Sequence, residues 1–104
     1  MSYTQREIIT TITPLLEGYP VKRAALFGSY ARNEQTPGSD VDLLLDLGVN
    51  AANPSVDYVF DLLSLIEDKI NLQVDYLTVR GLQTNPSAQF KSSVEKESWW
   101  FYEA

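Results

Sequence analysis

Two short apolar runs joined by a polar turn constrain this chain more than any other feature. The first run, Ala24–Phe27 at the end of a strand expected over residues 21–27, leads into Gly28 and Ser29, and the second, in a strand expected over 41–47, begins directly after Asp40. Apolar runs of this length between Gly, Ser and Asp are typical of β-strands. Because the connection between them is short, we expect the two strands to pair antiparallel within a mixed sheet.

Helix signals precede these strands. Thr4 and Glu7 have the spacing of a capping box, and the helix that they start is expected to kink at Pro14 and to end at Gly18. A short helix is also expected over residues 30–33, directly after the Gly-Ser turn. The apolar residues that recur at helical spacing in the first helix are Ile8, Ile9, Ile12, Leu15 and Leu16.

Two Asn-Pro pairs predict further helices, because Asn caps a helix and Pro suits its first position. Asn53-Pro54 would start a helix after a loop at 50–53, and Asn85-Pro86 would start one that runs to about residue 96. A third strand is expected at 72–77, between these helices. The order α-β-(short α)-β-α-β-α predicts a single α/β (α+β) domain over residues 1–104, with helices packed against a small mixed sheet.

The composition restricts the chemistry that this chain can perform. Its 104 residues include no cysteine and no histidine, which excludes thiol nucleophiles, thiolate zinc sites and the commonest general base. Catalysis would then use carboxylates, hydroxyls, Arg or Lys with an oxygen-preferring cation. The formal net charge of −6 argues against a nucleic-acid-binding face, and no apolar stretch is long enough to span a bilayer. We expect a cytoplasmic protein without direct nucleic-acid or membrane contact.

Asp40 and Asp42 are candidate metal ligands. Residues two apart in a strand point to the same face, so their carboxylates would lie side by side. Two unpaired carboxylates repel each other, and a divalent cation removes that penalty. A pair of Mg²⁺ ions can share such ligands in phosphoryl transfer. An isolated Asp-x-Asp is more often a solvated loop end, but the position between a Gly-Ser turn and an apolar strand favours the metal site.

Asp75 is the third candidate carboxylate, inside the apolar strand at 72–77. A buried strand aspartate without a partner is costly, so it would need a metal, a cation or hydrogen-bond donors. If this strand neighbours the second one, Asp75 can join Asp40 and Asp42, ligate a metal and accept a proton from an attacking hydroxyl. The alternative is an exposed position on an edge strand.

Gly28, Ser29 and Arg32 are candidate phosphate ligands. Glycine at a strand end lets the backbone approach a ligand closely, and the N–H groups that follow favour phosphate. The Ser29 hydroxyl can add a hydrogen bond, and Arg32 lies one turn further on. Taken alone, a Gly-Ser pair is common in ordinary turns and Arg32 is equally well a surface arginine.

Two other features have less specific interpretations. Asp46 shares a strand face with Asp42 and is expected to be a surface acid at the strand end. The aromatic tail, Trp99–Tyr102, could close the core or form a docking surface for a partner. The remaining acids indicate the solvated face of the second long helix; they are Asp57, Asp61, Glu67 and Asp68.

The combined pattern resembles the signature of the DNA polymerase beta-like nucleotidyltransferase superfamily, and is most similar to its minimal nucleotidyltransferase (MNT) branch. The resemblance covers nearly the whole chain, and the order and spacing of the parts make it specific. Asn33 departs from the family, which often has Gly there; Asn tolerates left-handed geometry, so the turn is expected to survive. The matching residues are Gly28, Ser29, Arg32, Ser39, Asp40 and Asp42, with Asp75 on the later strand.

The resemblance implies Mg²⁺-dependent transfer of AMP from ATP to an acceptor hydroxyl, with release of pyrophosphate. Asp40, Asp42 and Asp75 would be catalytic and would bind two Mg²⁺ ions. Many members of this branch are antitoxins of HEPN-ribonuclease toxins, and some adenylylate a tyrosine of the toxin. A HEPN-type toxin is therefore the expected partner, and the acidic chain would suit a basic one. The nucleotide-binding residues implied are Gly28, Ser29, Arg32 and Ser39.

Three other functions remain open from the sequence. The chain could be a non-catalytic antitoxin that masks its toxin by binding, using the same surface. It could modify a small molecule such as an antibiotic, although such nucleotidyltransferases resemble this fold with an additional domain. An acidic α/β domain without catalysis is the generic alternative. Loss of protection on mutation of the aspartates would separate catalysis from masking.

Overall fold

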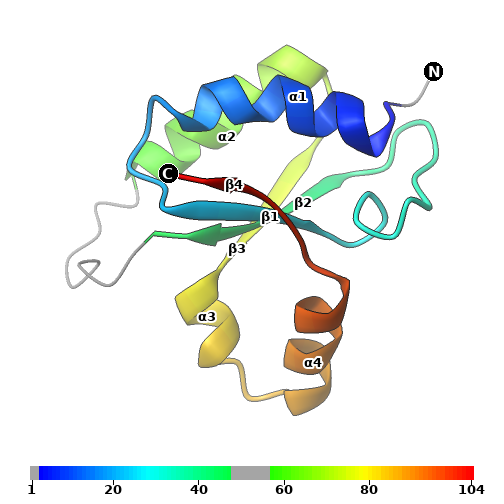
Figure 1. The fold of residues 1–104 in the computed structure, drawn as a ribbon, viewed down its shortest axis with the longest axis vertical. Coiled ribbons are helices and arrows are strands. Elements are labelled where there is room, and N and C mark those ends of the chain that lie inside the picture. The colour runs from blue at the N-terminus through cyan, green and yellow to red at the C-terminus, as the bar shows by residue number, and fades with distance from the viewer. Residues whose placement is uncertain (1–2, 48–56) are drawn as a thin grey trace.

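The computed structural model describes residues 3–47 and 57–104, which form one four-stranded sheet with helices on both faces (Figure 1). In Figure 1, α1 and α2 lie on one side of the sheet, and α3 and α4 lie on the other. None of the helices in these ranges is long and apolar enough to cross a membrane. The elements are α1 (Gln5–Leu16), β1 (Arg23–Phe27), β2 (Val41–Asp46), α2 (Asp57–Ile70), β3 (Val74–Thr78), α3 (Val79–Gln83), α4 (Ala88–Glu97) and β4 (Trp99–Glu103).

The sheet is mixed, with the strand order β3-β2-β1-β4. The expected antiparallel pairing of β1 with β2 is confirmed, and β4 pairs antiparallel with the other side of β1. The pairing of β2 with β3 is parallel and places Asp42 opposite Asp75. Parallel neighbours need a crossover, which α2 provides. The expected mixed α/β architecture is therefore present, with β2 in an interior position next to both β1 and β3.

The two faces of the sheet carry cores of unequal size. The larger core fills the space between the sheet and α1 with α2, and it includes Val41, Leu43 and Leu45 of β2. Alternation along β2 points Leu44 to the opposite face, where a small cluster holds α3 and α4 against the sheet. Its buried members are Ala25, Leu44, Leu82 and Val94.

The first helix begins as its sequence indicates. The Thr4 hydroxyl accepts from the Glu7 N–H at 3.1 Å, and the Thr4 N–H donates to the Glu7 carboxylate at 2.8 Å. This reciprocal pair is the expected capping box, and it satisfies two N–H groups at the helix start. The helix continues past Pro14 to Leu16, so the proline does not end it.

Four local expectations differ from the structure. Residues 30–33 form a hydrogen-bonded turn and not a helix, and the short helix α3 was not anticipated. The last helix starts after Ser87, whose hydroxyl accepts from the Phe90 N–H, while Asn85 accepts from the Ser87 N–H and forms the turn before it. The aromatic tail forms strand β4. The expected loop at 50–53 and helix start at Asn53-Pro54 lie outside the described residues.

Candidate active site

The three candidate aspartates gather on the face of the sheet that α3 and α4 cover. Strand pairing places Asp42 next to Asp75 on β3, and Asp40 lies just before β2. Asp42 is partly buried, whereas Asp40 and Asp75 are exposed. The expectation that Asp75 is buried is wrong, because β3 is an edge strand paired only with β2. The exposed-edge alternative describes its environment, and this leaves its carboxylate accessible to solvent.

The surroundings of Asp42 disfavour its negative charge. Burial raises the pKa of Asp42 to about 6, with further increases from the nearby charges of Asp75, Asp40 and Glu97. The guanidinium of Arg32 acts in the opposite direction and lowers it. An acid with this pKa is partly protonated at neutral pH, so a cation would be needed to hold it fully ionised.

The donor chemistry of the three aspartates fits a hard divalent cation. In the described part of the chain none of Asp40, Asp42 and Asp75 has a hydrogen-bond or ion-pair partner. Carboxylate oxygens are the ligands that Mg²⁺ prefers, and the register brings two of them together. As they stand, no three acidic side chains within residues 3–47 and 57–104 converge closely enough to hold one ion.

Gly28 is required by its backbone and by its neighbour. It ends β1 with φ of +75°, a conformation that side chains other than glycine's rarely adopt. The carboxylate of Asp42 occupies the space in which a side chain at Gly28 would begin. A Cβ at this position would overlap Oδ2 of Asp42 and lie 3.2 Å from its Cγ. The turn at Gly28 and the candidate metal ligand Asp42 are therefore tightly packed against each other.

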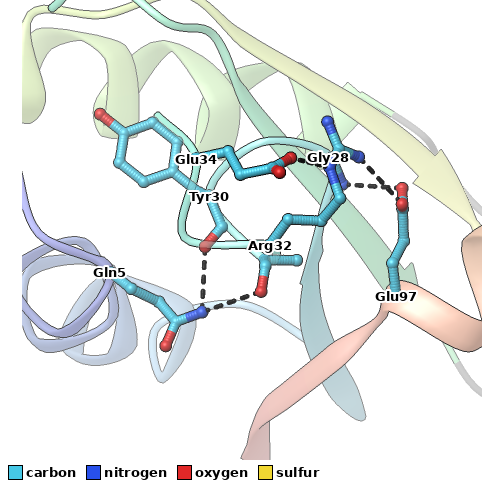
Figure 2. A network of polar contacts seen from close by, with 7 residues as sticks. Gln5, Gly28, Tyr30, Arg32, Glu34 and Glu97 are labelled. Carbon is cyan, nitrogen blue, oxygen red and sulfur yellow. Dashed lines mark hydrogen bonds and ion pairs between the residues drawn. The ribbon is translucent and has the colours of Figure 1, made fainter. Parts of the chain in front are cut away.

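The turn after Gly28 is braced from α1 (Figure 2). The N–H of Arg32 donates to the carbonyl of Gly28 at 3.1 Å, and Asn33 follows with φ of +58°. This confirms that Asn33 adopts the left-handed backbone conformation that glycine more often adopts. Figure 2 shows the side-chain amide of Gln5 donating to the carbonyls of Tyr30 and Ala31, at 2.9 and 3.2 Å.

Glu97 is a site residue that the sequence reasoning missed. It ends α4, and its carboxylate accepts from the Gly28 N–H at 3.1 Å and from Nη1 of Arg32 at 2.9 Å. Glu34 binds Nε of the same arginine at 2.6 Å, and Figure 2 shows both carboxylates turned toward Arg32. One signal was available: a carboxylate at the end of a helix is opposed by the helix dipole and needs a compensating partner.

The two serines differ in how they are used. Ser29 lies between Gly28 and the braced turn, and its hydroxyl has no hydrogen-bond partner among the described residues. Ser39 closes the turn before Asp40, because its hydroxyl accepts from the Thr36 N–H at 2.9 Å. Ser29 is thus available to a ligand, while Ser39 already has a structural partner.

Asp46 lies at the far end of β2 from the candidate site, while the aromatic tail runs along β1 from Trp99 beside Leu26 to Glu103 beside Arg23. Arg23 forms an ion pair with Asp46 at 2.9 Å and lies over the ring of Trp100, 4.3 Å from its centroid. Asp46 is thus a structural partner of β1 and not simply a surface acid. Phe101 and Tyr102 pack on the larger core, whereas Trp99 and Trp100 remain exposed.

The chain is similar to known proteins in sequence and in fold. A family model described as a nucleotidyltransferase domain matches residues 8–99, which span all three aspartates, the glycine turn and Glu97. The protein named "Putative protein adenylyltransferase MJ0128" of Methanocaldococcus jannaschii is 40% identical over 83 residues. The match covers 80% of this chain and 79% of that protein.

Solved structures show the same fold. One described as "Structure of putative minimal nucleotidyltransferase" superposes with a TM-score of 0.70 at 22% identity, over 93% of this chain and 95% of that one. Another, of a tri-AMPylated Shewanella oneidensis HEPN toxin in complex with its MNT antitoxin, matches with a TM-score of 0.62 at 18% identity. That match covers 97% of this chain and 74% of the other. At these identities the likeness concerns the fold.

Proposed function

This chain belongs to the nucleotidyltransferase domain family, and from that membership we propose that it acts as a minimal nucleotidyltransferase with a specific reaction. The protein transfers AMP from ATP to a hydroxyl group of a partner protein, with Mg²⁺, and releases pyrophosphate. The acceptor is a tyrosine of a HEPN-ribonuclease toxin, for which this chain is the antitoxin in a hetero-oligomer. The reaction belongs to the cytoplasm and involves no direct contact with nucleic acid.

The observation that carries the proposal is the pairing of Asp42 with Asp75 beside Gly28. It joins two carboxylates to a backbone turn whose donors suit an anion, on one face of the sheet. A structural role for these acids would supply them with donors inside the protein. Instead burial, together with the charges of Asp75 and Asp40, raises the pKa of Asp42 to about 6, which costs stability unless a ligand compensates.

Each residue of the site has a role in this reaction. Asp40, Asp42 and Asp75 would hold Mg²⁺, which supplies charge neutralisation at the phosphates and orients them for attack. The Gly28 N–H, the Ser29 hydroxyl and Arg32 donate to phosphate oxygens and stabilise the charge that develops during transfer. Ser39 supports the turn that positions Asp40. Asp75, exposed at the sheet edge, is reachable by an incoming hydroxyl and accepts its proton.

The protein acceptor is proposed from the relatives and from the charge of the chain. A relative is named as a protein adenylyltransferase, and a fold neighbour is an antitoxin bound to a toxin that carries AMP groups. The described residues form a single sheet domain, and we propose that residues 1–104 act as one catalytic unit. The net charge of −6 favours a basic partner, whose approach it would steer.

Labelled ATP tests the reaction directly. The purified protein is incubated with Mg²⁺ and an extract of its source cells, once with α-phosphate-labelled and once with γ-phosphate-labelled ATP. We expect a labelled protein band from the α-label only, because AMP and not the terminal phosphate is transferred. Mass spectrometry of the band should locate one added AMP on tyrosine.

Matched variants identify the residues responsible. Asp42→Asn and Asp75→Asn are expected to reduce labelling by at least about a hundredfold, in line with the loss of a metal-binding or proton-accepting group. Asp68→Asn makes the same chemical change on an exposed position of α2, across the sheet, and should label normally. Undiminished labelling in the Asp42 variant would contradict the proposed site. Protection from the toxin without any label would favour masking, and label confined to small molecules would favour an antibiotic-type substrate.

A further inference from the structure

Two donors of the proposed phosphate site are already bound by an anion of the protein itself. One oxygen of Glu97 accepts from the Gly28 N–H, and the other accepts from the guanidinium of Arg32 (Figure 2). A backbone N–H and a guanidinium in this arrangement are the groups that bind phosphate oxygens elsewhere. The Glu97 carboxylate thus presents a negative charge and two acceptor oxygens to the donors that a phosphate would use.

Glu97 and a nucleotide phosphate compete for the Gly28 N–H. Gly28 has one N–H, which Glu97 accepts, and Glu97 also binds Nη1 on the side of the Arg32 guanidinium that faces Gly28, while Glu34 binds Nε. A phosphate that approaches Gly28 must therefore replace the carboxylate. The Glu97 side chain is 23% exposed, so water can solvate its charge as it leaves.

The position of Glu97 is unfavourable for a purely structural residue. It is the last residue of α4, where the partial negative charge of the helix end disfavours a carboxylate. It also adds a negative charge to a group of three aspartates, and it is one of the charges that raise the pKa of Asp42. Conflicts between local preference and position are expected at functional sites. Moving the Glu97 carboxylate away from the aspartates would relieve the second conflict.

We propose that Glu97 is an internal competitor for the nucleotide, which occupies the phosphate site of the free protein and is displaced by the triphosphate. The inference rests on the proposed function, because it uses the same phosphate site. It makes Glu97 a determinant of nucleotide affinity. Since α4 leads directly into β4, displacement of Glu97 also links nucleotide binding to the aromatic strand at the sheet edge.

Nucleotide affinity tests the proposal without requiring catalysis. An ATP analogue with a methylene bridge between its α- and β-phosphates binds but cannot release AMP. Calorimetric titration with this analogue and Mg²⁺ is expected to give a Kd about three- to tenfold lower for Glu97→Gln than for the wild type, the range expected for loss of a partly exposed charged competitor. Glu97→Asp, which keeps the charge on a shorter side chain, should also bind more tightly.

Glu95→Gln is the matched control. It removes the same charge from an exposed position two residues earlier on α4 and should leave the Kd unchanged. In transfer assays Glu97→Gln should lower KM with little change in kcat, because only ground-state competition is removed. The emission of Trp99 and Trp100, the chain's two tryptophans, should change on titration of the wild type and change less in Glu97→Gln.

The outcomes separate this inference from the proposed function. Equal or weaker binding by both Glu97 variants, with a wild type that binds the analogue, would overturn the competitor and leave the reaction standing. Absence of binding by every folded protein would overturn both. Tighter binding by the variants without AMP transfer to any protein would support the competitor and refute the proposed transfer.

Discussion

The Asp42 side chain fills the space beside Gly28, so that position has no room for a larger residue. Gly28→Ala would add a Cβ that overlaps the Asp42 carboxylate and would place alanine at φ of +75°. We expect transfer activity to be lost, and the free energy of unfolding to fall by about 2 kcal/mol or more from backbone strain and steric overlap. Urea denaturation and the labelling assay measure the two effects.

Gly38 supplies the control for backbone strain. It has φ of +86°, but a Cβ there would meet nothing within 4 Å. Gly38→Ala should cost about 1–2 kcal/mol from conformation alone and should retain activity. If the two substitutions proved equally costly and both variants remained active, the close approach of Asp42 to Gly28 would have no functional importance.

The raised pKa of Asp42 makes stability depend on pH. The unfolded chain releases this proton near 3.8 and the folded protein near 6, so between these values the folded state binds more protons. The free energy of unfolding therefore falls as pH rises through this window. Without metal, Asp42→Asn should be more stable than the wild type at pH 7, by about 1 kcal/mol after allowing for solvent screening of a partly exposed group.

Chemical denaturation at pH 3.5 and pH 7 in the presence of a chelator checks this dependence. The difference between Asp42→Asn and the wild type should disappear at the lower pH, where both side chains are neutral. Asp68→Asn, on the exposed face of α2, should show no such pH-dependent gain. A constant difference at both pH values would mean that the charge of Asp42 is not destabilising.

Among the elements, α4 is held to the sheet by one buried side chain, although it carries Glu97 of the candidate site. It brings Glu97 to Gly28, yet its buried contact is Val94 in a cluster with Ala25, Leu44 and Leu82. Val94→Ala should reduce the free energy of unfolding by about 1–2 kcal/mol through the cavity that it leaves. It should also raise local hydrogen exchange in α4 beyond the global effect.

Val59→Ala makes the same change in the larger core under α2. It should lower protection across the sheet, and α4 should lose no more protection than the rest. If hydrogen exchange rose uniformly over the whole domain in both variants, α4 would unfold only together with the domain. That result would count against a Glu97 that moves independently of the rest of the protein.

Elements with strong local signals could be predicted from the sequence, and those that depend on partners could not. The capping box at Thr4, the strands beside Gly28 and the strand around Asp75 follow from spacing and alternation. The aromatic tail has no polar alternation, so only its pairing with β1 identifies it as a strand. The short α3 depends on the Thr78 hydroxyl at its start and on Leu82 beneath it.

The candidate site divides in the same way. The aspartates and the glycine turn are recognisable because their spacing is local and chemically specific. Glu97 is 69 residues from Gly28 in sequence, and its role depends on how α4 packs. The exposure of Asp75 likewise depends on β3 being at the edge, which no local pattern encodes.

For the whole molecule, the net charge of −6 and the neighbouring aspartates lead us to expect that a cation stabilises the fold. At pH 7 Mg²⁺ should raise the Tm of the wild type, because its free energy of unfolding should grow by about 1.4 kcal/mol for each tenfold excess of Mg²⁺ over Kd. The free energy of unfolding of Asp42→Asn should rise much less with Mg²⁺. Its higher stability relative to the metal-free wild type should therefore shrink or reverse when Mg²⁺ is present. Sodium chloride at matched ionic strength and Asp68→Asn are the controls. An equal gain with sodium chloride would indicate general screening and not a site.

The parallel pairing of β2 with β3 has a consequence for the order in which activity is acquired. Antiparallel β1 and β2 are close in sequence, but β3 can join only after the chain has closed the long loop that contains α2. Contacts of high sequence separation form slowly. Asp42 therefore meets Asp75 late, and a chain arrested before that step has a glycine turn without its complete set of carboxylates. Only completely folded copies would then be catalytically active. Partly folded copies would neither consume ATP nor modify a protein other than the intended acceptor.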